Sequence, residues 1–413
     1  MSRVIGLDIS KRMAEVAILQ SGEAAPQRTR FPAQPAAIAR FASGLGPGDR
    51  VALESCTNAV AFHRLLSQHA GEVVLSNPLK TRIIAEAKVK TDKVDAEILA
   101  RLLAADFLPL VWVPDAATQQ LRHLVFHRQG IVTQKTQAKN RIHAILHRNL
   151  IAPEMADLFG RAGRRLLASI DLAPDERALL DADLRVLDFL EGEIEAADRR
   201  LAEIALDDPD MRRLMTVPGL SLTSAVGLKA SVGDIRRFRA APHLVSYFGL
   251  NPSVYQSGQT AYHGHISRRG CSHARAVCVE VAHQLVKAPG PFHAFFERLR
   301  RRKPYNVAIT AVARKLVVLV WHMLTRAEDY RYMPPALTRK KLSRVHKLAT
   351  GQPLPRSPRG AGRNAGDDRQ AGREGERDYN GFIDDRFGSE GPPTHAMAST
   401  RTAQTSGTGK KRD

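Results

Sequence analysis

The alternation of β-rich runs and helical segments in the first quarter of the chain most constrains the fold. Turn residues separate five β-rich runs, which are Val4–Leu7, Ala14–Leu19, Gln27–Phe31, Arg50–Ser55 and Val73–Ser76. Segments with helical periodicity lie between the later runs and after them. The order β-β-β-α-β-α-β-α-α predicts an α/β domain with a mixed sheet.

Two acidic residues lie at the ends of predicted strands. Asp8 ends the first strand, and Glu54 lies at the end of the run Arg50–Ser55. Sheets of this class place their functional sites at strand ends. We therefore expect these two carboxylates to lie at one edge of the sheet.

A second pair of acids begins a predicted helix. The stretch Val89–Ala105 has apolar residues at helical spacing, and Thr91 is a suitable N-cap. Asp92 and Asp95 are three residues apart, which puts both carboxylates on one helix face. Acids are favoured at a helix N-terminus by the helix dipole alone. The other interpretation is that a cation lies between them.

Taken together, the four carboxylates of Asp8, Glu54, Asp92 and Asp95 predict a metal site. Hard oxygen ligands bind Mg²⁺ or Mn²⁺. Two such ions can stabilise the attacking and leaving oxygens of a phosphodiester. The carboxylates would then be both metal ligands and catalytic residues.

The charge of the chain predicts a polyanionic partner. The net charge is +20 and the pI is about 10.3, an excess that is typical of nucleic-acid-binding proteins. The three cysteines form no disulfide framework and no CxxC zinc motif, so we expect a reduced, cytoplasmic protein. Met1–Ser10 lacks the pattern of a signal peptide. No segment of about 18 apolar residues is evident, so we expect no membrane span.

Two long helices are predicted in the middle of the chain, over 117–150 and 174–206. Residues 112–165 contain nine Lys/Arg against three acids. These cations predict either a helix that follows phosphates or a solvated helix face. The candidates for nucleic-acid binding are Arg128, Lys135, Lys139 and Arg141. The Leu-rich spacing of the second helix suits an antiparallel helical pair or a dimeric coiled coil.

The second half of the chain predicts a mainly α-helical nucleic-acid surface. The Pro218-Gly219 turn and the small residues after it are similar to a helix-hairpin-helix, whose turn amides hold a phosphate, or form an ordinary helical hairpin. Residues 229–315 contain fifteen Lys/Arg against three acids. The stretch 249–270 predicts a loop or short β-hairpin. Candidate contacts here are Gly219, Arg236, Arg237, Arg268, Arg269, Arg300 and Arg301.

After about Pro334 the chain is poor in apolar residues and rich in Gly, Arg and Asp. Such a composition predicts a disordered basic, Gly-rich tail over 333–413. The remaining predicted segments are a catalytic domain over 1–108, a long helical linker over 109–208 and a C-terminal domain over 209–332.

Several motifs resemble those of the IS110/IS1111-family transposases. GLDIS around Asp8, ALES around Glu54 and KTDKVDAEILARLL resemble the DEDD motif of the family's first domain, which is similar to the RuvC resolvase and RNase H-like in fold. TVPGLSLTSAVGLKASVGDIRRF, YFGLNPSVYQSG and GHISRRGCSHAR resemble its C-terminal transposase domain. The resemblance spans residues 3–330, and the two motif sets occur in the family's order. Cys271 stands where the family has a small polar residue.

The resemblance implies a recombinase that excises and inserts its own DNA element. It implies joint use of the acidic site and a nucleophilic serine, which the motif match places at Ser257. Tyr255 and Tyr262 are rival nucleophiles in the same loop, and His263 and His265 are candidate proton carriers. The resemblance also implies a structured guide RNA that pairs with donor and target DNA. Cutting two duplexes suggests a homodimer or tetramer, in a bacterial protein associated with the nucleoid.

Three functions remain open from the sequence. The first is a DNA recombinase that uses both the metal site and the serine. The second is a structure-selective endonuclease of the Holliday-junction type that uses only the carboxylates. The third is a nucleic-acid-binding protein without catalytic activity.

Overall fold

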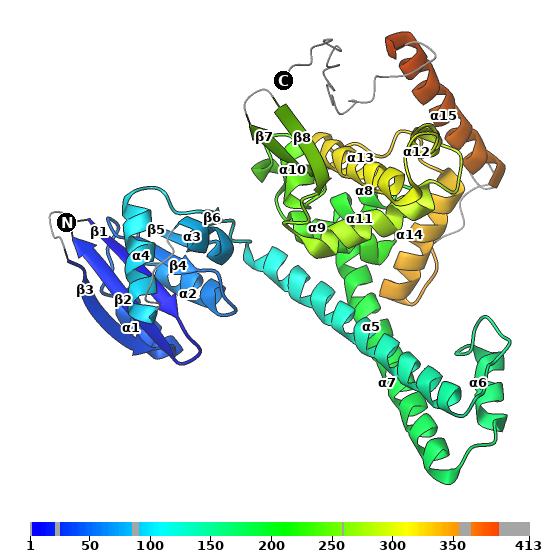
Figure 1. The fold of residues 1–413 in the computed structure, drawn as a ribbon, viewed down its shortest axis with the longest axis horizontal. Helices are drawn as coiled ribbons and strands as arrows, with labels where there is room; N and C mark the ends of the chain where they lie inside the picture. Colours follow the sequence, from blue (N-terminus) through cyan, green and yellow to red (C-terminus); the bar gives the residue numbers. More distant parts are fainter. Residues whose placement is uncertain (1, 21–24, 85–90, 258–259, 355–364, 388–413) are drawn as a thin grey trace, which may run out of the picture. The chain divides into compact units, whose positions relative to one another are not determined.

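The structure is a computed structural model, and it describes residues 2–20, 25–84, 91–257, 260–354 and 365–387. The chain forms two compact units, Met1–Asp115 and Ala116–Asp413, which we describe separately (Figure 1). The predicted boundaries at 108, 208 and 332 divide the chain more finely and stay predictions.

The first unit contains a six-stranded sheet in the order β3-β2-β1-β4-β5-β6. Its strands are β1 (Arg3–Ile9), β2 (Met13–Gln20), β3 (Gln27–Pro32), β4 (Arg50–Glu54), β5 (Glu72–Ser76) and β6 (Leu110–Val111). Strands β1, β4 and β5 are parallel, whereas β2, β3 and β6 pair in the antiparallel sense. The predicted mixed sheet is confirmed.

Helices cover both faces of this sheet. On one face, α1 (Pro35–Ala42) and α2 (Ala59–Leu66) pack against the buried side chains of β1 and β4, such as Leu7 and Leu53. On the other face lies α4 (Asp92–Ala104), whose Leu99 packs with a separate small core. The short helix α3 (Pro78–Ile84) follows β5.

Gly6 sets the distance between β1 and α4. A Cβ atom at Gly6 would lie 2.0 Å from the backbone oxygen of Ala96 and 2.6 Å from the backbone nitrogen of Ala100. No side chain fits between the strand and the helix backbone at this point. The absence of a side chain at Gly6 therefore lets α4 lie directly on the strand that carries Asp8.

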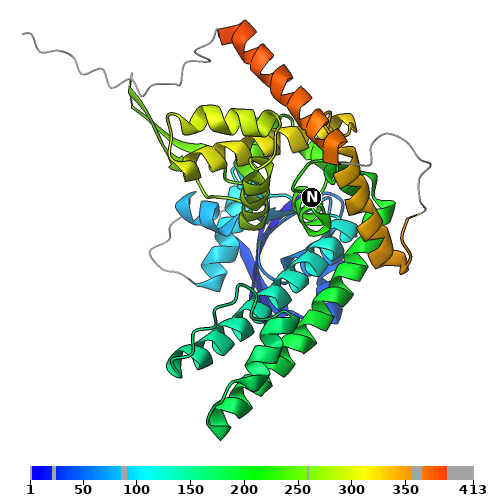
Figure 2. The same ribbon diagram turned by 90° about the vertical axis from the view of Figure 1, so that its right-hand side faces the viewer.

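The second unit begins with a helical hairpin. The helices α5 (Ala116–Arg148) and α7 (Pro174–Asp207) lie side by side and run in opposite directions, and α6 (Arg161–Ser169) lies in the connection between them (Figures 1 and 2). Ile142, Leu167 and Leu180 belong to a core that joins the three helices. The antiparallel pair agrees with one of the two predicted arrangements, and coiled-coil geometry stays a prediction.

A larger helical body follows, with one core that includes Val226, Phe248 and Leu316. Its helices are α8 (Pro209–Leu214), α9 (Leu222–Val232), the 3₁₀ turn η1 (Ile235–Arg237), α10 (Ala241–Tyr247), α11 (Ser272–Leu285), α12 (Pro291–Arg300) and α13 (Tyr305–Arg326). A two-stranded hairpin, β7 (Pro252–Ser257) and β8 (Thr260–Ile266), lies between α10 and α11. The predicted mainly α-helical second half with a short β-hairpin is confirmed.

Helix α13 corrects one prediction about the sequence. By length and hydropathy it is a candidate membrane span, although half of its most apolar stretch is buried in the protein. The prediction that no such segment exists was wrong. The buried side chains of Ile309, Leu316 and Val320 belong to the core of the second unit.

The predicted disordered tail is also wrong over two stretches, because α14 (Pro335–Thr350) and α15 (Ala365–Phe387) are helices. The carboxylate of Asp368 in α15 accepts hydrogen bonds from the backbone nitrogens of Ala336, at 2.9 Å, and Leu337, at 3.1 Å. Ile383 is buried, at 8% exposure. Specific polar contacts and a few apolar anchors hold α15 despite its polar composition. Residues 355–364 and 388–413 lie outside the described part of the chain.

Candidate active site

The sheet brings two of the predicted acids to one edge. Strands β1 and β4 are parallel neighbours, and Leu7 is in register with Leu53. Asp8 and Glu54 follow these two residues, so both lie toward the carboxyl ends of adjacent strands. This is the placement that the sequence predicts.

The other two acids lie in the first turn of α4. The hydroxyl of Thr91 accepts a hydrogen bond from the backbone nitrogen of Val94, which confirms the predicted N-cap. Both acids therefore gain from the helix dipole. Asp92 is exposed and Asp95 is half-buried, so their carboxylates remain reachable from solvent.

The electrostatics of Asp8 couple it to the other three acids. Burial is the largest cause that raises the pKa of Asp8, and the negative charges of Asp92, Asp95 and Glu54 raise it further, to about 6. A hydrogen bond to the backbone of Ile9 acts in the opposite direction. Like charges affect a pKa in this way only at short range. The structure thus brings the four predicted acids into one electrostatic environment.

Cys56 lies beside the same acids, and the sequence analysis did not single it out. Burial raises the pKa of its thiol most, and the charges of Glu54 and Asp8 add to this, whereas hydrogen bonds to the backbone of Asn58 and Ala59 lower it. The thiol donates to the Asn58 side-chain oxygen at 3.0 Å. A protonated thiol is a poor metal ligand.

The donor set suits a hard divalent cation. It consists of carboxylate oxygens, and a cation between them would relieve the repulsion that raises the pKa of Asp8. However, in the part of the chain that the structure describes, no three His, Cys, Asp or Glu side chains converge closely enough to hold a metal ion. The chemistry of the site therefore fits a metal better than its side-chain geometry does.

The hairpin of β7 and β8 contains Ser257. Its backbone ends β7 and pairs with Thr260, while its side chain lies outside the described part of the structure. Tyr255 and Tyr262 face each other across the strands, and both are exposed. The side chain of His263 also lies outside the described part, and that of His265 is exposed.

The predicted phosphate-following face of α5 is occupied by contacts within the protein. Arg128 pairs with an aspartate of α7, Lys135 pairs with a glutamate at 2.8 Å, and Arg141 pairs with another aspartate at 2.7 Å. The Lys139 ammonium lies 4.5 Å from the centre of the Phe159 ring. The sequence left open a phosphate-binding face or a solvated face. These contacts favour a third interpretation, in which the cations stabilise the packing of α5 against α7 and against the connection between the two helices.

Two predicted nucleic-acid contacts of the larger helical body, Arg236 and Arg237, also make contacts within the protein. The Arg237 guanidinium donates to the Val232 carbonyl and lies over the rings of Phe238 and Tyr247. Burial lowers its pKa. Arg236 makes an exposed ion pair with the aspartate two residues before it.

Gly219 has a φ of 80°, and a side chain there would contact Val281 and Gln284 of α11. The turn at Gly219 is therefore packed against a helix, and its helix-hairpin-helix role stays a prediction. Its carbonyl neighbours at Met215 and Val217 accept hydrogen bonds from the side chain of Lys341.

The remaining four candidate cations, Arg268, Arg269, Arg300 and Arg301, are exposed. Arg268 adopts a left-handed backbone conformation with a φ of 54° at the end of the hairpin. The Arg300 guanidinium lies 5.6 Å from the centre of the Tyr305 ring. Tyr305 shares a hydrogen bond of 3.1 Å with His283, so aromatic side chains that the sequence analysis did not single out lie beside the predicted basic residue Arg300.

Comparisons with known proteins bear on both units. Residues 5–150 match a transposase family model for the DEDD domain of IS110 elements, and residues 211–297 match the model of the transposase IS116/IS110/IS902 family. Together the two matches cover more than half of the chain. They include the four acids and the Ser257 hairpin.

Whole relatives are similar over most of their lengths. A probable family 20 transposase of Pseudomonas aeruginosa is 26% identical over 79% of this chain and 98% of its own. The transposase for insertion sequence element IS1111A of Coxiella burnetii is 25% identical over 68% of this chain and 79% of its own. The pilin gene-inverting protein of Moraxella bovis is 24% identical over 65% of this chain and 77% of its own.

The DEDD match implies an RNase H-like fold and a divalent-metal site for the first unit, and the family implies DNA as the substrate. The mixed sheet with helices on both faces and acids at its strand ends agrees with that fold. This chain belongs to the IS110 family of insertion-sequence transposases, enzymes that cut and rejoin DNA.

Proposed function

We propose that this transposase cuts and rejoins DNA with Asp8, Glu54, Asp92 and Asp95 as ligands of Mg²⁺ or Mn²⁺ and with Ser257 as the nucleophile. The acidic site is supported by the placement of Asp8 and Glu54 at the ends of adjacent parallel strands and by the raised pKa of Asp8, whose largest cause is burial and to which the negative charges of Asp92, Asp95 and Glu54 add. Such pKa shifts concentrate at functional sites. When bound, the metal neutralises these charges and stabilises the negative charge that develops on the phosphate oxygens.

In the proposed step the Ser257 hydroxyl oxygen attacks the DNA phosphorus. A bond forms between the serine oxygen and phosphorus, the bond from phosphorus to one deoxyribose oxygen breaks, and the freed sugar oxygen takes up a proton to become a hydroxyl. The hydroxyl proton of the serine passes to a base, for which the exposed His265 of the same hairpin is a candidate. The covalent phosphoserine conserves the bond energy, so attack by another strand's hydroxyl rejoins the DNA.

Rejoining favours this proposal over simple hydrolysis. One relative inverts a pilin gene, and an inversion requires that both cut strands be joined again. The alternative is a structure-selective endonuclease that activates water at the carboxylate site alone. In that case the reaction would leave no covalent protein–DNA product.

We further propose that a structured guide RNA selects the donor and target DNA by base pairing, and that the protein acts as a dimer or tetramer. The net charge of +20 supports a large nucleic-acid surface. A discrete RNA that co-purifies with the protein from its native host would support the guide. Copurification of only random cellular RNA fragments would contradict it.

The nucleophile can be tested by trapping the covalent product. Protein, element-end DNA, co-purified RNA and Mg²⁺ should yield a protein–DNA adduct that Ser257→Ala removes. Ser253→Ala is the matched control, because Ser253 lies in the same strand and its hydroxyl donates to the His265 carbonyl within the hairpin. An adduct that survives in Ser257→Ala and disappears in Tyr255→Phe or Tyr262→Phe would reassign the nucleophile. Cleavage without any adduct would favour the endonuclease.

A further inference from the structure

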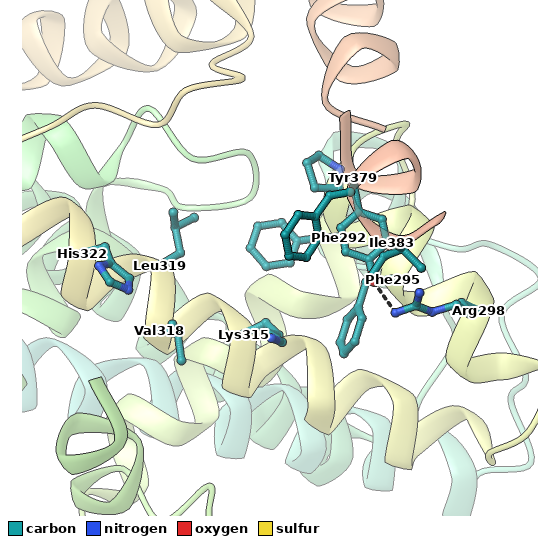
Figure 3. A pocket seen from close by; sticks show the side chains of 11 residues that line it. Phe292, Phe295, Arg298, Lys315, Val318, Leu319, His322, Tyr379 and Ile383 are labelled. Carbon is teal, nitrogen blue, oxygen red and sulfur yellow. Dashed lines mark hydrogen bonds between the residues drawn. The ribbon is translucent and has the colours of Figure 1, made fainter. Parts of the chain in front are cut away.

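A cavity of about 550 Å³ lies among α12, α13 and α15 (Figure 3). Its walls are mainly apolar, and aromatic rings form a large part of them. Phe292 and Phe295 come from α12, whereas Tyr379 and Phe382 come from α15. Neither the acidic site nor the Ser257 hairpin contributes to this cavity.

Three basic side chains also line the cavity, which are Arg298, Lys315 and His322. The Arg298 Nη2 atom donates to the Tyr379 hydroxyl at 2.6 Å, and the Lys315 ammonium lies 5.8 Å from the centre of the Phe295 ring. Among the described residues the walls contain no Asp or Glu. The cavity is therefore apolar and aromatic, with positive charge at its edges.

Two nitrogen atoms in these walls lack hydrogen-bond partners within the described structure. They are Nη1 of Arg298 and Nδ1 of His322, and both are shielded from solvent. A buried polar atom without a partner is destabilising. A ligand with hydrogen-bond acceptors would relieve this cost once these side chains turn toward it.

An unpaired nucleotide matches the aromatic walls, the unsatisfied donors and the positive charge of the cavity. Its base is a flat aromatic body with acceptor atoms, and its phosphate carries a negative charge. Proteins that bind single strands combine a positive groove with aromatic side chains on which bases stack. The exposed basic run that begins at Arg300 and ends at Lys303 starts at the last residue of α12 and continues into the following turn.

We propose that this cavity binds one unpaired nucleotide of a DNA strand, with the base among the four aromatic rings and the phosphate near Arg298 and Lys315. The inference rests on the proposed function, because cutting and exchanging strands produces unpaired DNA. The cavity is a site that the proposed cutting and rejoining steps do not use. Since α15 supplies part of the aromatic wall, this helix becomes part of the DNA-binding surface.

The test compares the binding of two probes to the full chain in EDTA, so that cleavage does not interfere. One probe is a short oligothymidylate and the other is an abasic strand of equal length and charge. Stacking of a base on an aromatic side chain is worth about 1–3 kcal/mol, so the wild type should bind the first probe about 5- to 150-fold more tightly. Phe382→Ala should lose most of this ratio, and Lys315→Gln should weaken both probes alike.

Phe189→Ala is the matched control, because Phe189 is an exposed phenylalanine of α7 outside the cavity. It should keep the wild-type ratio. Thermal unfolding of Phe382→Ala is measured alongside, and the ratio of the two affinities is compared at a temperature where the variant is fully folded. Equal loss of affinity for both probes in Phe382→Ala would overturn the proposal.

A base-dependent effect of Phe382→Ala on oligouridylate but not on oligothymidylate would also overturn the assignment to DNA. These readouts need neither Ser257 nor the metal. A wild-type protein that binds DNA in a base-dependent way but carries out no strand transfer would therefore refute the proposed function alone.

Discussion

Replacing Gly6 by alanine should separate the strand that carries Asp8 from the helix that carries Asp92 and Asp95. The new Cβ atom would lie 2.0 Å from the Ala96 oxygen, whereas ordinary contacts begin near 3.4 Å. Helix α4 or strand β1 must therefore move by about 1.4 Å, since backbone atoms cannot rotate away as a side chain can.

The magnitude follows from this displacement. Overpacking of a core typically costs about 1–3 kcal/mol. We expect Gly6→Ala to lower the free energy of unfolding by an amount at the upper end of this range, near 3 kcal/mol, because the clash involves the helix backbone at both ends of one turn. A misplacement of about 1 Å in a catalytic site costs on the order of 100-fold in rate. The variant should therefore lose DNA cleavage even at temperatures where it is folded.

The positions of the two tryptophans allow the unfolding of the first unit to be measured separately by tryptophan fluorescence. Trp112 lies in the first unit and Trp321 in the second, so urea unfolding in a Trp321→Phe background reports on the first unit. Gly44→Ala is the control, because a Cβ atom there meets only the Phe41 oxygen at 3.4 Å. It should change the free energy of unfolding by less than about 0.5 kcal/mol. If Gly6→Ala unfolds like Gly44→Ala and cleaves DNA at the wild-type rate, the close approach of α4 does not position the acids.

Three further predictions concern single side chains. Since the pKa of Asp8 is raised to about 6, Asp8 binds more protons in the folded metal-free protein than in the unfolded chain between about pH 4 and 6, and its contribution to stability falls as the pH rises through this range. Asp8→Asn should remove this pH-dependent contribution and, after allowance for partial exposure, stabilise the metal-free first unit at pH 7 by about 1–2 kcal/mol. The same variant should abolish DNA cleavage. If urea titrations give the same dependence of stability on pH for the variant and the wild type, the prediction is contradicted. Lys341→Ala should destabilise the second unit by about 2 kcal/mol, because the carbonyls of Met215 and Val217 lose a buried donor; calorimetry of wild type and variant measures this, and no loss would argue against it. Asp368→Ala should cost about 1 kcal/mol and speed hydrogen exchange in the first turn of α14, and unchanged exchange there would refute the capping role.

The sequence predicts the first unit well because its signals are local. Alternating apolar residues and turn residues mark each strand, and the strand order follows from short connections. Asp8 and Glu54 could be placed at one edge because parallel neighbouring strands end together. The close approach at Gly6 could not be predicted, since it depends on which helix crosses that strand and at what distance.

Charged residues were harder to interpret. A lysine or arginine on a helix face looks the same in the sequence whether it contacts phosphate, water or a neighbouring helix. Lys135 and Arg141 pair with acids of α7 that lie far along the chain, and only the folded hairpin reveals these partners. Composition likewise suggested disorder after Pro334, because single contacts such as those of Asp368 have no compositional signal.

The contact between Asp368 and the start of α14 also bears on the order of events during synthesis. Asp368, which accepts the hydrogen bond from the backbone N–H of Ala336, lies 32 residues after it in the chain. At about 5–20 residues per second, the ribosome needs roughly two to six seconds to add that stretch. During this interval the first turn of α14 is exposed without its acceptor, while the basic surface around Arg300 has already been made. A nascent chain would thus present that surface to nearby DNA before α15 arrives to cover one side of α12.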